Sequence, residues 1–250
     1  AANRTALNAG FAFGPSLGGL MACYSWNLIF YADALTTLIY AVIALFALPH
    51  GLRSKGRDVA TERIWREILR NGSFLIFALA TFFVAVTFMQ MNATFPLLVV
   101  DSGFDPWVFG IITSYNGLLV VLVELPLTSI TRRYAARNVI VLGYFLIGAG
   151  MALAAFAATV PMFFVVMTVF TLGEIIAMPM VPTYLARVAP ADRRGRYMGV
   201  FGLTWAMALL LGPKVGLVIY ETDPDLWWYL CGGFGVVAAL LMHFNPAGLA

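Results

Sequence analysis

The chain has 250 residues, of which 62% are hydrophobic and 11% are charged, and its mean hydropathy is +0.89. A soluble globular domain carries about 25% charged residues, so this composition excludes an ordinary soluble protein and indicates an integral membrane protein. The net charge of +3 is small beside its uneven distribution along the chain, and no nucleic-acid partner is expected.

Eight apolar segments are long enough to cross a bilayer, which takes about 20 residues per helix. They lack the roughly 10-residue alternation of outer-membrane barrels, so we predict an all-α integral membrane bundle. The predicted spans cover residues 1–24, 26–48, 73–99, 107–130, 139–158, 161–186, 197–220 and 227–244.

The first span contains the stretch LNAGFAFGPSLGGL. Glycines that recur every four residues form a smooth stripe against which a neighbouring helix can pack, and a proline permits a bend there. We therefore predict a conformational motif, with structural packing alone as the alternative. Its residues are Gly10, Gly14, Pro15, Gly18 and Gly19.

The connector 49–72 is the longest loop, and its end reads TERIWREILR. This pattern places Ile64, Trp65, Ile68 and Leu69 on one helical face and charged residues on the other. It predicts a short amphipathic helix on the inner membrane surface, or alternatively a solvated linker helix.

Basic residues gather in every second connector. Thirteen of the 15 Lys and Arg residues follow the second, fourth and sixth spans, whereas Asp101–Asp105 and Glu221–Asp225 carry only acids. The positive-inside rule then places the basic loops and both ends of the chain in the cytoplasm.

Ionisable residues inside spans are functional candidates, because each costs at least about 2.5–3.5 kcal/mol at mid-membrane. Glu174 lies nearest the middle of its span, where a low dielectric favours the neutral carboxyl group and suits proton uptake and release. A protonated glutamate bonded to a neighbouring helix is the alternative. The further candidates for proton coupling or substrate binding are Glu124, Asp33 and Arg4, whereas Lys214 is expected to snorkel to the surface.

Polar side chains in the spans are weaker candidates for the binding site. Asn92 and Asn116 are the stronger of these, because amides in lipid need partners, and Tyr115 is a further candidate. Aromatic and methionine residues near them either line a cavity or pack between helices. The two cysteines and two histidines are scattered, so no metal site, catalytic group or cofactor is predicted.

Gly14-Pro15-Ser16-Leu17-Gly18 recurs as Gly212-Pro213-Lys214-Val215-Gly216, six spans later. Gly212, Pro213 and Gly216 thus form a second copy of the conformational motif. Parallel repeats of six spans characterise one large transporter class. If the unit is six spans, four spans would precede residue 1.

On these residues the chain resembles helices five to twelve of a twelve-helix major facilitator superfamily transporter, and in particular bacterial drug:proton antiporters. The fifth-helix signature of those antiporters matches the conformational motif, and FTLGEIIAMP and PADRRGRYMG match two further regions. The resemblance implies that 1–48 ends an N-terminal six-helix half, 49–72 is a cytoplasmic linker, and 73–250 is the C-terminal half.

The expected function is secondary active transport, namely proton-coupled export of small amphipathic compounds by alternating access in a bacterial inner membrane. The expected partners are a small-molecule substrate, protons and lipid, and the protein is expected to be monomeric and not an enzyme. No GxxxxGK[ST] phosphate loop occurs, which argues against an ATP-driven pump within this chain. The alternatives are a nutrient or lipid transporter of the same fold, or an eight-helix channel or membrane enzyme.

Overall fold

The structure is a computed structural model that describes residues 10, 14, 21, 25–47 and 61–246. The regular elements in this part of the chain are all helices, which confirms the predicted fold class. Seven of the described helical segments are long and apolar enough to cross a membrane, and they correspond to the second to eighth predicted spans. Most of the first predicted span, 1–24, lies outside the described residues.

The chain divides into two compact units, residues 1–64 and 65–250. The first contains α2 (Trp26–Ala47), an apolar helix of 22 residues. The amphipathic helix predicted at the end of the connector is present as α3 (Thr61–Arg70), in which Ile68 is buried.

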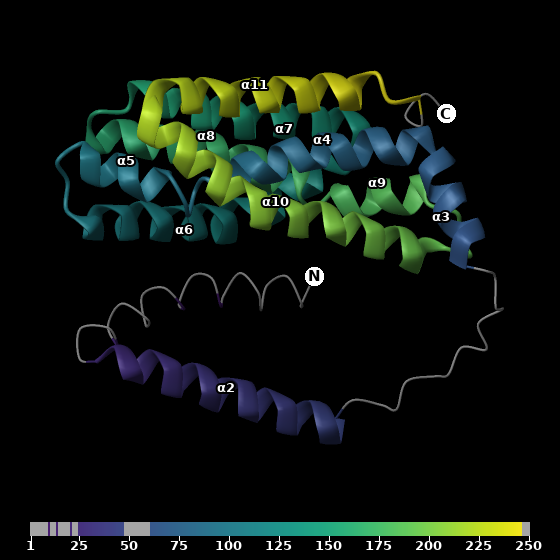
Figure 1. Ribbon diagram of the computed structural model, residues 1–250, viewed down its shortest axis with the longest axis horizontal. Coiled ribbons are helices and arrows are strands. Elements are labelled where there is room, and N and C mark those ends of the chain that lie inside the picture. The colour runs from purple at the N-terminus through teal and green to yellow at the C-terminus, as the bar shows by residue number, and fades with distance from the viewer. Residues whose placement is uncertain (1–9, 11–13, 15–20, 22–24, 48–60, 247–250) are drawn as a thin grey trace. The chain divides into compact units, whose positions relative to one another are not determined.

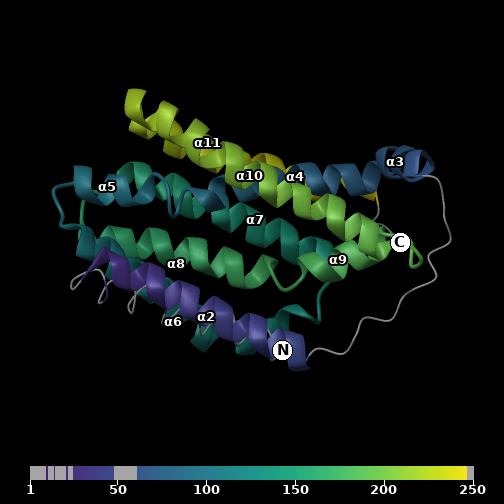
Figure 2. The ribbon, with the colours of Figure 1, turned by 60° about the horizontal axis from the view of Figure 1, so that its bottom comes forward.

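The second unit is a helical bundle in which successive long helices run in alternating directions (Figures 1 and 2). α7 packs between α8 and α11, α4 packs against α10 and α11, and α6 flanks α8. The elements in chain order are α4 (Gly72–Met89), α5 (Phe95–Asp101), α6 (Pro106–Thr131), α7 (Ala136–Ala152), the 3₁₀ turn η1 (Leu153–Phe156), α8 (Val160–Ala177), α9 (Val181–Val188), α10 (Arg194–Thr222) and α11 (Pro224–His243).

Two predicted spans, 73–99 and 161–186, each contain a turn in the structure. The first is divided into α4 and α5 by the turn at 90–94, and the second into α8 and α9 at 178–180. Each short helix has a proline in its first turn, and Pro179 within the second break cannot donate a backbone hydrogen bond. We call the end of the bundle that carries the basic loops the basic face. α4 begins at this face and α8 begins at the opposite one, so the break after α4 lies toward the opposite face and the break after α8 lies toward the basic face.

Glycines on α7 allow its neighbours to approach closely. A Cβ atom on Gly148 would lie 2.5 Å from the Cα of Gly235 on α11, and one on Gly150 would lie 2.6 Å from the backbone nitrogen of Phe170 on α8. Such backbone contacts are a main source of helix association in lipid, where burial of apolar surface drives little. α7 is therefore the central helix about which this unit is packed.

Large apolar side chains remain exposed on the outer helices. On α6 these include Leu118, Leu122 and Leu125, which are 53%, 61% and 69% exposed, and α10 exposes a comparable row of leucines. An extensive apolar surface of this kind marks contact with lipid or with another part of a membrane protein. The seven spans and this surface together describe a multi-pass membrane protein.

Candidate functional site

The carboxyl group of Glu174 belongs to a polar cluster between α6 and α8. The Asn116 side-chain nitrogen on α6 donates to Oε2 of Glu174 at 3.2 Å and to Oγ1 of Thr171 at 2.8 Å. Thr171 is fully buried, and its hydroxyl donates to the carbonyl of Met167 at 2.6 Å. The structure thus brings together two of the predicted site residues and adds Thr171.

Tyr115 continues this cluster by about one helical turn. Its hydroxyl lies 2.9 Å from Oγ1 of Thr168, and its ring meets that of Phe164 edge to face at 5.0 Å. Since the single Thr168 proton is donated to the Phe164 carbonyl at 2.7 Å, Tyr115 is the donor in the pair. We call these five residues, Tyr115, Asn116, Thr168, Thr171 and Glu174, the α6–α8 polar seam.

The seam has one titratable carboxyl group among neutral donors, near the middle of the span Val160–Val188. Glu174 and Asn116 are partly exposed, whereas the surrounding surfaces of α6 and α8 are largely apolar. A deprotonated Glu174 can accept hydrogen bonds from Asn116 and from a further donor, and a protonated one can itself donate. This arrangement can exchange a proton for the polar or cationic group of a ligand.

The other predicted ionisable residues lie outside the α6–α8 polar seam. Glu124 is 9% exposed on α6, two helical turns from Asn116 toward the basic face. Asp33 is exposed on α2 in the first unit, and Lys214 is exposed on α10. Arg4 lies outside the described residues. Within the described part of the chain, no group of His, Cys, Asp and Glu residues could hold a metal ion.

The second copy of the conformational motif packs against the break between α4 and α5. The buried side chain of Gln90 donates to the carbonyl of Gly212 at 3.0 Å and to that of Val86 at 2.9 Å. A Cβ atom on Gly216 would lie 2.9 Å from both Cδ of Gln90 and a ring carbon of Trp227. Pro213 lies within α10.

The contacts of Gln90 with α10 continue to α11 through Thr94. Its hydroxyl donates to Oε1 of Gln90 at 3.2 Å and accepts from the indole nitrogen of Trp227 at 3.2 Å. Sequence reasoning missed Gln90 and selected Asn92, which is exposed in the turn. The available signal was a glutamine inside an apolar run just before Pro96, because a buried amide in lipid needs partners.

Of the first copy of the motif, Gly10 and Gly14 are helical, with open space at the position of a Cβ atom. Pro15, Gly18 and Gly19 lie outside the described residues. The predicted glycine stripe therefore stays a prediction.

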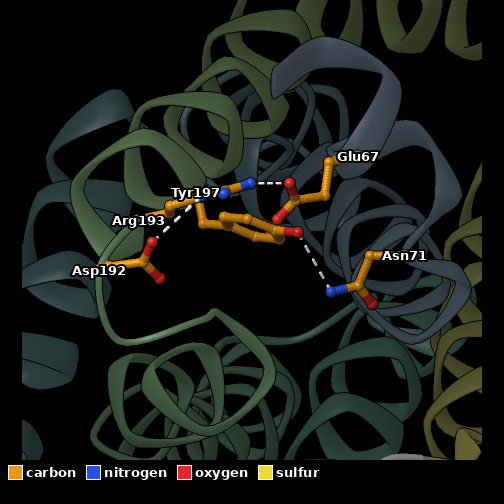
Figure 3. Close-up of polar contacts among 5 residues, drawn as sticks. All are labelled: Glu67, Asn71, Asp192, Arg193 and Tyr197. Carbon is orange, nitrogen blue, oxygen red and sulfur yellow. Dashed lines mark hydrogen bonds and ion pairs between the residues drawn. The ribbon is translucent and has the colours of Figure 1, made fainter. Parts of the chain in front are cut away.

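A further polar cluster joins α3 to the start of α10 (Figure 3). Arg193 forms ion pairs with Glu67 of α3 and with its neighbour Asp192. Asn71 caps α4 by accepting from the backbone of Phe74 at 3.0 Å, and it donates to the carbonyl of Val188 and the hydroxyl of Tyr197, both at 3.3 Å. The matched segment PADRRGRYMG thus anchors the end of the connector.

Comparison with known proteins identifies what the chain is similar to. The family model of the Major Facilitator Superfamily matches residues 1–213 and 91–247. The MFS-type transporter YttB of Bacillus subtilis (strain 168) is 24% identical over 233 residues, which cover 86% of this chain and 55% of that protein. A Na(+), Li(+), K(+)/H(+) antiporter of Planococcus maritimus is 24% identical over 270 residues, covering 96% and 61%.

The multidrug resistance protein MdtH of Proteus mirabilis (strain HI4320) is 25% identical over 246 residues, which cover 94% of this chain and 60% of MdtH. The chain thus spans between 55% and 61% of the length of these three relatives. The similarity extends over 86–96% of the chain.

Proposed function

The chain belongs to the major facilitator superfamily, and from that premise we propose that it forms part of a proton-coupled carrier that exports small amphipathic compounds by alternating access. The carrier acts as a monomer in the bacterial inner membrane, with the basic loops and both ends of this chain in the cytoplasm. It binds and releases its substrate without chemical change.

The observation that carries this proposal is the hydrogen-bonded Glu174 carboxyl group in the middle of a span. Ionisable groups at this depth are expensive and mark ion or substrate pathways. In our scheme Glu174 holds a proton in one state and the polar or cationic group of the substrate in the other. Asn116 donates to the carboxyl group and fixes its position against α6.

The broken spans support a binding site in this unit. Carriers form their sites near the bilayer midplane, typically from interrupted helices. Glu174 lies one turn before the α8–α9 break, and its carbonyl accepts the backbone N–H of Met178 at 2.9 Å. In our scheme α9 changes its angle relative to α8 about this break as access alternates, and Glu174 lies one helical turn from the point of bending.

A second candidate function is the exchange of monovalent cations for protons. The relative from Planococcus maritimus is named as such an antiporter, and MdtH as a multidrug resistance protein. A carboxylate with neutral oxygen donors beside it also suits a small hard cation. Nutrient or lipid transport on the same fold is a more distant alternative.

The proposal is tested in everted vesicles that contain the full-length protein and hold a preformed proton gradient. Addition of a lipophilic cation such as ethidium should dissipate the gradient, and Glu174→Gln should abolish this response. The matched control is Glu221→Gln, because Glu221 is exposed at the end of α10. A response to NaCl or KCl but not to ethidium selects cation exchange. A wild-type response in Glu174→Gln, or ATP-driven uptake without a gradient, contradicts the proposal.

A further inference from the structure

A cavity of about 350 Å³ opens at the basic face of the second unit, and none of the residues in its wall belongs to the α6–α8 polar seam. Arg132 in its wall is sixteen residues from Asn116 along α6, or about 24 Å at 1.5 Å per residue. The cavity lies where α6 ends, α7 begins and α9 passes, with Pro179 and Met180 of the α8–α9 break in the wall. Its size is at the small end of ligand pockets, which run from about 300 to 1,000 Å³.

Two arginines line this cavity without a carboxylate beside them. Arg132 directly follows α6, and Arg187 lies in the last turn of α9. Among the described residues neither forms an ion pair, whereas Glu67 and Asp192 both bind Arg193 instead (Figure 3). Two guanidinium groups that face one hollow repel each other unless an anion lies between them.

The remaining polar groups in the wall are also suited to an anion. Thr183 contributes a hydroxyl, and Tyr134 contributes an amphipathic ring that is 66% exposed. Ala136 is the first residue of α7, and the preceding Ala135 provides no side-chain cap. The N–H groups of Asn138 and Val139 donate to the Ala135 carbonyl, so those of Ala136 and Arg137 are the ones in this turn that can serve a ligand. No acidic side chain belongs to the wall.

We propose that this cavity binds a phosphate group, which both arginines contact through paired N–H donors. Arginine recognises phosphate through this fork-shaped geometry, whereas hydroxyl and backbone N–H groups supply single hydrogen bonds. Both an anionic lipid headgroup and a soluble phosphate compound present this chemistry at a membrane surface. Once bound, the phosphate ties α9 to the ends of α6 and α7 and limits its movement about the α8–α9 break.

The test is thermal unfolding of the purified full-length protein in detergent at constant ionic strength. The probes are inorganic phosphate and dioctanoyl phosphatidylglycerol, with dioctanoyl phosphatidylcholine as the zwitterionic comparison. We expect a concentration-dependent rise in Tm that Arg132→Gln/Arg187→Gln loses. The matched control is Arg133→Gln/Arg194→Gln, which removes two exposed arginines from the same face outside the cavity and should keep the rise.

The outcomes distinguish a free phosphate group from a lipid headgroup, or refute the proposed site. A rise with inorganic phosphate assigns the site to a free phosphate group, and a rise with phosphatidylglycerol alone assigns it to a lipid headgroup. No rise with either probe overturns the proposal, as does an equal rise in Arg132→Gln/Arg187→Gln.

A second variant, Arg132→Lys/Arg187→Lys, keeps the charges and so protects the test against misfolding of the glutamine variant. Loss of one charged hydrogen bond per arginine should weaken binding at least about tenfold. Unchanged affinity in the lysine variant would mean diffuse attraction rather than a built site and would overturn the proposal.

Discussion

At the scale of single residues, Asn116 is the side chain that connects the carboxyl group of Glu174 with the hydroxyl of Thr171. We predict that Asn116→Ala lowers proton-linked transport at least about tenfold, because a partly buried carboxyl group that loses a donor loses about 1–3 kcal/mol of stabilisation. Vesicle assays of initial rates, normalised to the amount of protein in the membrane, provide the measurement.

The control for this variant is Asn138→Ala, since Asn138 is exposed at the start of α7. Its transport rate should equal that of the wild type. Equal rates in both variants, or equal losses in both, would show that the contact with Glu174 has no specific role.

Gly216 is a residue whose identity is set by close packing. An added methyl group would meet the side chains of Gln90 and Trp227 at 2.9 Å and disturb the bond from Gln90 to Gly212. We predict that Gly216→Ala destabilises the protein by about 1–3 kcal/mol, as overpacking typically does. Gly202→Ala on the same helix, where open space surrounds the Cβ position, should leave the Tm unchanged or raise it. Equal shifts in the two variants would contradict the assigned role.

The sequence was sufficient to select the polar site residues one by one, but not to predict which of them are hydrogen-bonded to each other. Glu174, Asn116 and Tyr115 stood out in the sequence because such groups need partners in lipid. Their pairing depends on how α6 is rotated against α8, which no single sequence reveals. Thr168 and Thr171 gave no signal, because a threonine can satisfy its hydroxyl on the carbonyl four residues earlier, as both do.

At the scale of elements, α7 joins its neighbours through glycine contacts. We predict that Gly148→Ala destabilises the protein by more than about 1–3 kcal/mol, because its Cβ would meet the backbone rather than a flexible side chain. Gly233→Ala on α11 is the matched control, since that position is exposed and open. Thermal unfolding in detergent checks both variants, and an unchanged Tm for Gly148→Ala would refute this view of the α7–α11 contact.

The helices themselves follow from hydropathy, but their breaks do not. The runs 73–99 and 161–186 are long and mostly apolar, so a rule based on span length predicts one helix in each. The breaks depend on where backbone groups can find other partners, such as the Gln90 side chain beside the turn at 90–94. Pro96 and Pro179 were the visible signals, but membrane helices also tolerate proline without breaking.

At the scale of the whole molecule, composition was sufficient to predict the all-α membrane fold, and the family match agrees with it. Charge distribution adds an orientation that we predict for the cell. In a cysteine-free background, Asp105→Cys should react with a membrane-impermeant maleimide on intact cells, because the acidic connectors face outward. Ala135→Cys, beside the basic loop, should react only after permeabilisation. The reverse pattern would place the basic loops outside.

The central claim is that Glu174 exchanges a proton for substrate. Its most direct test is proton release from the purified full-length protein in weakly buffered detergent solution, followed with a pH indicator as a transported compound is added. The wild type should acidify the solution in proportion to the substrate bound, and Glu174→Gln should release no proton under the same conditions. Equal acidification by Glu174→Gln and the wild type would contradict the claim.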